Sequence, residues 1–230
     1  GRHAPRAAVT RGPARHALIG ALLLVAAPVA FAQDDCTLSF GRGWPPATGN
    51  HGAAVEQLFT GDVQPAVSLV WLPATGKERG IALIPGAEGA AWTLRVSEAD
   101  ERVHVWSGGS ARGGVQFRTE QSPDRDEVRM PVPLAQRVAS LWQQALERAA
   151  PQGVNAPLQD RGLVSFLVNG ERFSGVAPDC GPAELLFDQV DLLVEASNES
   201  ESKQEKRWQQ LDAALDELQQ SLSGQAPAND

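Results

Sequence analysis

The sequence predicts an α+β fold in which an antiparallel β-meander packs against one helix, followed by a later β-hairpin and C-terminal amphipathic helices. Three observations support this prediction. Short runs of β-branched and aromatic residues, separated by Gly, Pro and Asp, recur over 66–130. Apolar residues recur at helical spacing over 133–149 and again over 183–223. Between these helical segments, 163–175 has the pattern of a hairpin.

The first 32 residues have the pattern of a secretory signal and are set aside from the fold. Four Arg and no acidic residue accompany an unbroken apolar run at 17–27, which Pro28 ends before the small-x-small sequence at 30–32. As a helix this run would be about 16 Å long, too short for the hydrocarbon core of a membrane. We therefore expect cleavage after Ala32 and a periplasmic or secreted protein without stable membrane insertion.

The charge of the remaining chain is strongly negative. The 230 residues contain 28 Asp and Glu against 20 Lys and Arg, and without the first 32 residues the net charge becomes −12. More than half of this charge lies in 183–223. Such acidity argues against nucleic acid and anionic membrane surfaces as partners. The excess of Arg over Lys, 17 to 3, is typical of a GC-rich bacterial genome.

Two cysteines remain after the expected signal, Cys36 and Cys180. An even number of cysteines in an exported protein predicts a disulfide, here between these two residues. The competing interpretation is a reactive thiol at Cys180, which precedes an expected helix start where a thiolate is stabilised. The His and Cys spacings match no metal-binding motif, so we predict neither a metal nor a cofactor.

The expected core domain covers 66–182 and follows a loop-rich leader, 33–65, which holds one short helix at 53–60. The meander strands are predicted from period-two alternation and from turn residues at their ends. These strands are 67–72, 80–84, 92–96, 102–106, 115–119 and 128–130.

The helix at 133–149 has its apolar residues on one face and ends at Pro151. The hairpin at 163–175 turns at Asn169-Gly170, the preferred pair for a type I′ turn. A final helical region begins near Pro182, and we expect a disordered tail at 224–230. Whether this region is one long helix or two helices in a hairpin stays open, because its middle is wholly polar.

The end of the acidic helical region, 183–223, carries an apolar seam at heptad spacing. Its members are Trp208, Leu211, Leu215, Leu218 and Leu222. The seam either packs back on its own domain or pairs with itself or with a partner protein through 200–223.

An aromatic surface is a second candidate for binding. Trp71, Trp92 and Trp106 lie on predicted strands, and on a shared exposed face they would stack sugars or a Pro-rich peptide. The alternation around Trp92 places it in the core. The neighbours of Trp106, Val103 and Val105, point to the other face, so Trp106 is the best candidate for an exposed ring.

Catalytic motifs are weak in this sequence, and we predict no catalytic residue. Only His51 and His104 remain after the signal, without a nucleophile elbow. The LPATG sequence at 72–76 lies between two strands and predicts a turn. Gly76-Lys77 is not a phosphate loop, because Glu78 stands where a Ser or Thr would hold magnesium. The alternating charges at 124–127 predict a solvated turn.

These observations favour a non-catalytic periplasmic binding or assembly factor that acts through the C-terminal amphipathic helix and Trp106. They leave one alternative, a hydrolase on cell-wall or glycan substrates that uses carboxylates or His104 as acid–base groups.

Overall fold

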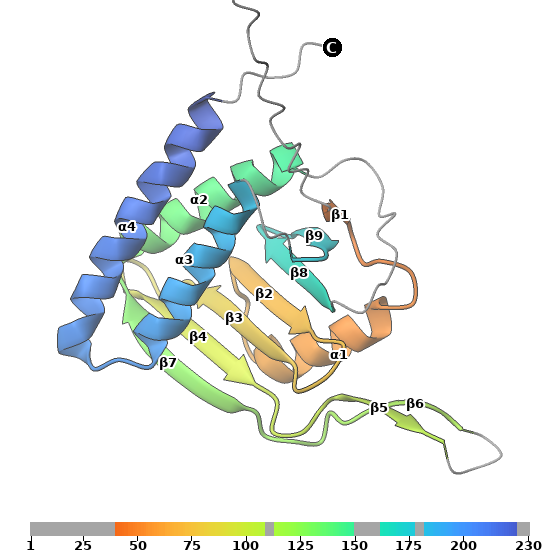
Figure 1. Ribbon diagram of the computed structural model, residues 1–230. Helices are drawn as coiled ribbons and strands as arrows, with labels where there is room; N and C mark the ends of the chain where they lie inside the picture. The colour runs from red at the N-terminus through yellow and green to blue at the C-terminus, as the bar shows by residue number, and fades with distance from the viewer. Residues whose placement is uncertain (1–39, 109–112, 150–161, 178–181, 225–230) are drawn as a thin grey trace, which may run out of the picture. The chain divides into compact units, whose positions relative to one another are not determined.

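The computed structural model describes residues 40–108, 113–149, 162–177 and 182–224, all within one compact unit that spans 36–230. In these ranges it confirms the α+β fold, with four helices, a seven-stranded antiparallel sheet and a separate two-stranded ribbon (Figure 1). The helices are α1 (Gly49–Thr60), α2 (Val132–Ala149), α3 (Pro182–Ser197) and α4 (Glu201–Gly224). The strands are β1 (Phe40–Arg42), β2 (Val67–Leu72), β3 (Arg79–Ile84), β4 (Trp92–Glu98), β5 (His104–Ser107), β6 (Gly114–Phe117), β7 (Asp124–Met130), β8 (Leu163–Val168) and β9 (Glu171–Gly175).

The large sheet has the strand order β1-β9-β8-β2-β3-β4-β7, and every neighbouring pair is antiparallel. Its central strands contain mostly buried apolar residues, as expected for strands covered on both faces. The two edge strands differ from them. β1 has only three residues, and β7 carries alternating acidic and basic residues. Short length and charge both protect a sheet edge from pairing with another chain.

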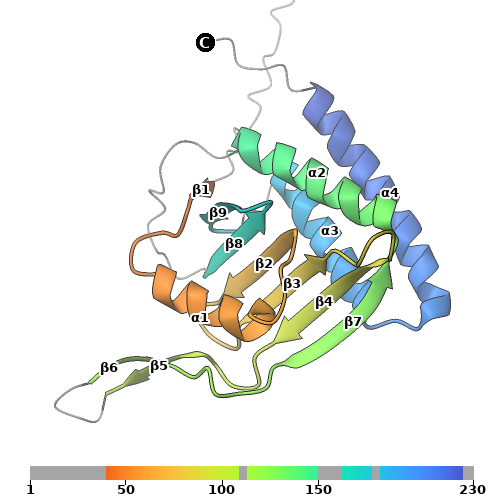
Figure 2. The same ribbon diagram turned by 180° about the vertical axis from the view of Figure 1, so that it is seen from behind.

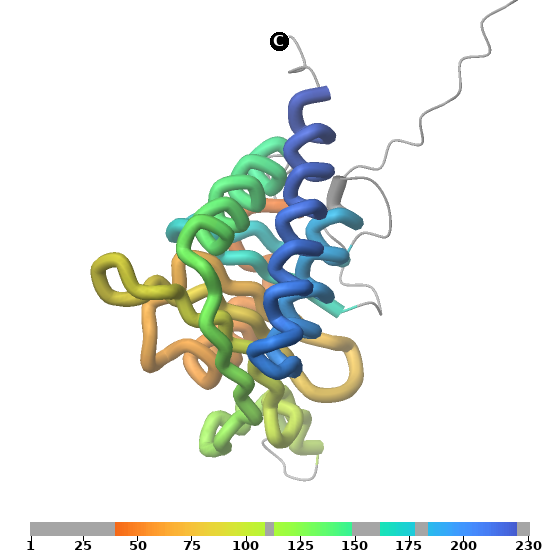
Figure 3. The backbone as a smooth tube through the Cα atoms, turned by 90° about the vertical axis from the view of Figure 1, so that its left-hand side faces the viewer, coloured from red at the N-terminus to blue at the C-terminus, as the bar shows by residue number. Residues whose placement is uncertain are grey.

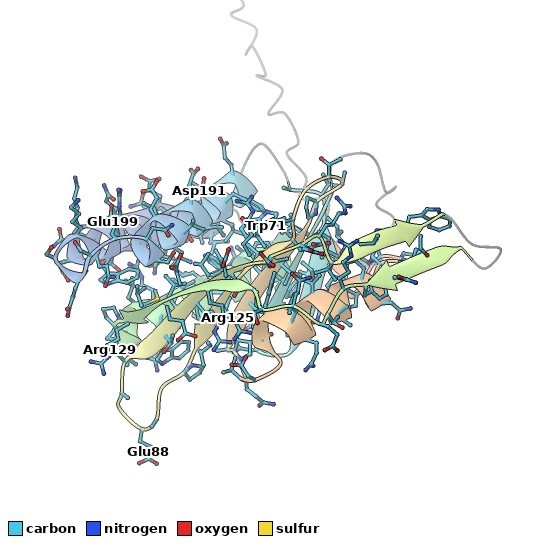
Figure 4. All side chains as sticks on the ribbon, turned by 90° about the horizontal axis from the view of Figure 1, so that it is seen from below. Trp71, Glu88, Arg125, Arg129, Asp191 and Glu199 are labelled. Carbon is cyan, nitrogen blue, oxygen red and sulfur yellow. The ribbon has the colours of Figure 1, made fainter. Side chains whose placement is uncertain are left out.

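Helices lie against both faces of this sheet, and Figure 2 shows α1 in front of the strands and α3 behind them. Leu69 and its neighbours of the same parity pack with α2, α3 and α4 in the main core. Val70, one residue further along β2, points to the other face and packs with Val55 and Phe59 of α1 in a second, smaller core. Seen from below, α3 and α4 lie on one side of the sheet and α1 on the other (Figure 4).

The segment expected to be a loop-rich leader contributes directly to both cores. Phe40 of β1 is buried against Phe166 in an edge-to-face pair, and Val55 and Phe59 of α1 are buried under β2. The helix also begins at Gly49, four residues before the expected start. Few apolar residues with turn formers between them predicted a loop, but those few side chains are the ones that pack on the sheet.

Buried and half-buried arginines hold α1 on the sheet. Arg95 of β4 donates to Asp62 at 2.7 Å and to the carbonyl oxygen of Phe59 at 3.0 Å, both at the end of the helix. Arg172 of β9 donates hydrogen bonds from Nη1 and Nη2 to the two carboxylate oxygens of Glu56, at 2.6 and 2.9 Å. Bidentate pairs of this kind fix orientation as well as distance. They therefore fix the position of His51, which lies on the first half of α1.

Two expected strands leave the meander, which corrects the predicted order. Residues 102–106 and 115–119 correspond to β5 and β6, which pair only with each other in the described chain, while β4 pairs directly with β7. The residues 124–127, expected to form a turn, belong to β7. The later hairpin is confirmed as β8–β9, with positive φ at Asn169 and Gly170, but β8 also pairs with β2 and so extends the large sheet.

The C-terminal region forms two helices, α3 and α4, separated at 198–200 (Figure 3). Among the helices of the described ranges, none combines the length and apolarity that a membrane span requires. The expected signal at 1–32, the expected disulfide between Cys36 and Cys180, and all but the first residue of the expected tail at 224–230 lie outside the described residues.

Candidate functional site

The β5–β6 hairpin carries the largest exposed apolar side chains of the described residues. Trp106 is 67% exposed and Val115 is 45% exposed. The two residues are direct partners across the ribbon, so their side chains lie on the same face. The prediction that Trp106 has an exposed ring is confirmed. Figures 1 and 2 show the ribbon extending away from the large sheet.

One face of this ribbon continues from the exposed end to the body of the domain. His104 pairs with Phe117, and both lie on the side of the ribbon that carries Trp106 and Val115, because alternate strand residues share a face. We call these four residues the hairpin face. Its outer half, Trp106 and Val115, is exposed, and its inner half, His104 and Phe117, is half-buried. The opposite side of the ribbon carries Gln116.

The inner half of the hairpin face packs against His51 of α1. The Phe117 ring lies parallel to the His51 ring, with centroids 5.9 Å apart and an interplanar angle of 8°. The His104 ring is 5.0 Å from His51 and 6.1 Å from Phe117. Three aromatic rings therefore meet where the ribbon joins the domain.

A buried carboxylate, Glu78, holds this junction together. Its side chain has no exposed surface, and it accepts a hydrogen bond from His51 Nε2 at 2.8 Å. It also accepts the backbone N–H groups of Val103, at 2.7 Å, and of His104, at 3.2 Å. Because a carboxylate only accepts, His51 Nε2 carries a hydrogen. We call His51, Glu78 and His104 the Glu78 cluster.

The surroundings of Glu78 favour its charged form. Burial alone would raise its pKa, but the hydrogen bonds from His51 and from the amides of Val103 and His104 outweigh burial, so the pKa of Glu78 lies below its ordinary value. The carboxylate is thus ionised at neutral pH and places a buried negative charge at the junction.

His104 is shifted in the direction that favours its neutral form. Burial lowers its pKa, and electrostatic repulsion from the neighbouring His51 and Arg102 lowers it further, against the opposing attraction of Glu78. At neutral pH the His104 ring is therefore uncharged, and no side chain of the hairpin face carries a charge.

Arg102 fastens the start of the hairpin to the turn between β2 and β3. Its guanidinium donates to the carbonyl oxygens of Pro73, Ala74 and Gly76 at 3.2, 2.9 and 3.2 Å. These residues belong to the LPATG sequence, whose predicted turn is confirmed between the ends of β2 and β3. The amide of Arg118 closes the base of the ribbon by donating to the Val103 carbonyl oxygen at 2.8 Å.

A hollow of about 430 Å³ lies beside this base. It includes Phe117, and three carboxylates line it, those of Asp100, Glu101 and Glu120. Arg118, which also lines the hollow, pairs with Glu101 at 2.8 Å. Within the described ranges, no group of His, Cys, Asp and Glu side chains is placed to hold a metal ion.

The apolar seam of α4 lies inside the domain. Its five side chains are between 0 and 7% exposed and belong to the main core. The seam members are Trp208, Leu211, Leu215, Leu218 and Leu222. Of the two arrangements that the sequence left open, the structure has the one in which the seam packs back on its own domain. Direct binding of a partner by these side chains stays a prediction, and it would require α4 to leave α2 and α3.

Polar contacts reinforce this packing. Arg137 of α2 reaches Asp212 and Asp216 of α4 at 2.6 and 2.5 Å. Gln189 of α3 accepts a hydrogen bond from Trp142 Nε1 at 2.6 Å and donates to the Ala214 carbonyl oxygen at 3.2 Å. All three helices are therefore joined by side-chain hydrogen bonds as well as by apolar contacts.

The other tryptophans do not extend the hairpin face. Trp71 and Trp92 are half-buried and pack against the main core, and Arg79 lies over the Trp71 ring. Trp44 lies under the guanidinium of Arg172, 4.0 Å from its ring centroid. Trp106 is thus the one exposed member of the aromatic set expected to form a shared surface.

Sequence reasoning missed two residues of the Glu78 cluster. His51 lay in the expected leader, and Glu78 was considered only for the phosphate loop that it rules out. They are 27 positions apart, and Glu78 lies 26 positions from His104. The one local signal was an acidic residue placed immediately before a buried strand.

No family model, no curated protein and no solved structure matches this chain. The site must therefore be interpreted from its own geometry.

Proposed function

We propose that this protein is a non-catalytic binding or assembly factor of the cell envelope, and that it binds its partner through the outer hairpin face, Trp106 and Val115. The exposure of this cross-strand pair carries the proposal. Soluble domains seldom leave large apolar side chains together on a projecting element unless that element contacts something. The expected export of the chain places this contact in the periplasm or outside the cell.

The edges of the two sheets support this assignment. The exposed edge strand of the large sheet, β7, is protected by alternating charges at 124–127. The hairpin strands have no such protection, since His104–Ser107 and Gly114–Phe117 contain no acidic residue, Lys or Arg. A ribbon with open edges and an exposed indole suits partners with flat apolar faces, such as sugar rings or Pro-rich peptides.

The C-terminal helix has an indirect part in this proposal. Because its seam is buried in the main core, α4 supports the sheet. The proposed contact with a partner is therefore assigned to the hairpin instead of to α4. Action of α4 on a partner directly is the variant of the proposal that requires the helix to undock.

Binding by Trp106→Ala tests the proposal. The wild type and the variant are compared on immobilised cell-wall glycan and on a Pro-rich peptide, and in affinity capture from periplasmic extract. We expect the variant to bind its ligand at least about tenfold more weakly, because exposed Trp residues in contact surfaces are frequent hot spots. Gln116→Ala, on the opposite side of the same ribbon, is the matched control and should bind as the wild type does. Equal binding by Trp106→Ala and the wild type would contradict the proposal.

A hydrolase is the second candidate, and one observation favours it. The hollow beside Phe117 gathers the carboxylates of Asp100, Glu101 and Glu120, and paired carboxylates are the acid and base of most glycosidases. Release of reducing ends from cell-wall glycan, lost in Glu101→Gln and Glu120→Gln but kept in Trp106→Ala, would favour this candidate over the binding factor.

A further inference from the structure

The junction between the hairpin and the domain is built around titratable groups. A hairpin whose base depended on apolar packing alone would respond little to pH. Here the backbone N–H groups of Val103 and His104, at the start of the hairpin, donate hydrogen bonds to the Glu78 carboxylate, and so does His51. The first residue of β5, His104, is itself a histidine. Protonation therefore acts at the point where the hairpin is attached.

We propose that the Glu78 cluster is an acid-sensitive anchor that holds the β5–β6 hairpin on the domain at neutral pH and releases it when His104 gains a proton. Regulation of ligand binding by this anchor rests on the proposed function of Trp106, whereas the release itself does not.

The charged groups around His104 explain the direction of the response. His51 faces it from α1, with ring centroids 5.0 Å apart, and Arg102 lies two residues before it. Among the residues that the structure describes, Glu78 is the one carboxylate that acts on it, and this group already accepts three hydrogen bonds. The fourth neighbour, Phe117, is apolar. A proton on His104 thus places a charge beside the Arg102 guanidinium, a second imidazole and an apolar ring, and opening the junction would return that charge to water.

The pH window follows from the direction of the shift. Because the pKa of His104 is lowered from 6.5 in the closed junction, the open form binds the proton more tightly. The contribution of His104 to anchoring is fully present above about 6.5 and is lost as the pH falls through the lower, closed-state pKa. Glu78, whose pKa is also lowered, stays ionised until the pH falls below its ordinary 4.5. Between pH 5 and 7.5 the loss of hairpin anchoring is therefore caused by protonation of histidine and not of Glu78.

The same hairpin face connects the anchor to the proposed binding residues. His104 and Trp106 are alternate residues of one strand, and their partners Phe117 and Val115 are alternate residues of the other. Loss of packing at the inner half removes the support that orients the outer half. A ligand that needs Trp106 in its anchored orientation would then bind more weakly in acid.

Amide hydrogen exchange of the ligand-free full chain tests the anchor. Protection of the Val103, His104 and Arg118 amides is measured between pH 5.2 and 7.5 and corrected for the intrinsic exchange rate. We expect their protection to fall below pH 6.5, by up to about tenfold per pH unit, the limit for one titrating group. Amides of β2 and β8 should keep their protection, which separates release of the hairpin from global unfolding. Constant protection at Val103 and His104 over this range would overturn the proposal.

Two further measurements isolate His104. His104→Phe keeps an aromatic ring at the junction without a titratable nitrogen, so its protection should not change over the same pH range. Gln116→Ala, on the opposite side of the ribbon, should keep the wild-type profile. In the wild-type protein, the His104 ring and the Val103 amide shift should titrate together with a midpoint below 6.5. A midpoint at 6.5 or above, or a wild-type response in His104→Phe, would also overturn the proposal.

Binding is then measured separately at pH 7.5 and 5.5. Release of the hairpin without any ligand binding at Trp106 would contradict the proposed function and leave the anchor standing. Ligand binding with constant amide protection would contradict the anchor and leave the proposed function standing.

Discussion

The α4 seam and the outer hairpin face are both apolar patterns on regular elements, but they have opposite surroundings. All five seam side chains are buried in the main core with residues of α2 and α3, whereas Trp106 is two-thirds exposed. Spacing determines which side chains share a face. It does not determine what covers that face, and the core covers the seam but leaves the outer hairpin face exposed.

Chain connectivity explains this difference. α3 and α4 are joined by only three residues, 198–200, so the second helix returns at once along the first and its seam reaches the main core. β5 and β6 lie between β4 and β7, which pair with each other throughout their length. The hairpin is therefore an excursion from two strands that already have partners. Its outer end has no neighbouring element in the described chain.

The largest effect is expected from the seam. Leu215→Ala removes a side chain with no exposed surface from the main core. We expect a loss of about 2–5 kcal/mol in the free energy of unfolding, because the cavity adds to the lost transfer energy. Urea unfolding followed by far-UV circular dichroism measures it. Gln220→Ala, on the exposed side of the same helix, should change stability by less than about 0.5 kcal/mol.

A small effect of Leu215→Ala would reverse the comparison. It would mean that α4 spends much of its time away from the core in solution. The seam would then be available to a partner, and direct binding by α4 would again be a candidate function alongside binding by the hairpin.

An intermediate effect is expected from the polar contact between the helices. In Gln189→Leu, the Trp142 Nε1 donor loses its buried acceptor, which should cost about 1–3 kcal/mol. The double variant Trp142→Phe with Gln189→Leu removes donor and acceptor together and should be less unstable than the sum of the single changes. Additive losses in the unfolding free energies would show that the bond does not couple the two side chains.

The difference between the two regions also shows how far the sequence could predict the fold. Alternation placed Trp106 on the exposed face correctly, since Val103 and Val105 mark the other side of the same strand. The same alternation could not show that β5 leaves the sheet, because a strand in a ribbon and a strand in a large sheet have the same local pattern. The charges at 124–127 resembled a turn, yet an edge strand tolerates them, since one of its edges meets water.

The candidate site was harder to predict than the fold for a physical reason. The hydrogen bonds of Glu78 span 25 to 27 positions of the sequence, and they exist only after α1, β3 and β5 have come together. No local period encodes such contacts. The exposed half of the site was predictable from one strand, whereas its buried half depends on three elements.

The smallest effect on stability is expected at the most exposed residue. Trp106→Ala removes a ring that is largely in water. Its partner across the ribbon is Val115, and a cross-strand pair of this kind contributes about 0.2–1 kcal/mol. That contribution stabilises the ribbon, and within the described chain the ribbon pairs with no strand of the large sheet. Because the ribbon can open locally without unfolding the sheet, the free energy of global unfolding should change by less than about 0.5 kcal/mol. Far-UV circular dichroism is the suitable probe, because the variant removes one of the six Trp residues that give the fluorescence.

A loss above about 1.5 kcal/mol in Trp106→Ala would show that the ring is covered in solution. Unfolding midpoints at several protein concentrations would then identify the cover, since a midpoint that rises with concentration indicates a second copy of the chain. With the expected result, the Trp106→Ala and Leu215→Ala variants differ clearly in how much free energy of unfolding they lose. Leu215 then matters for folding, whereas Trp106 contributes little to it, as is expected of a residue whose role is contact with a partner.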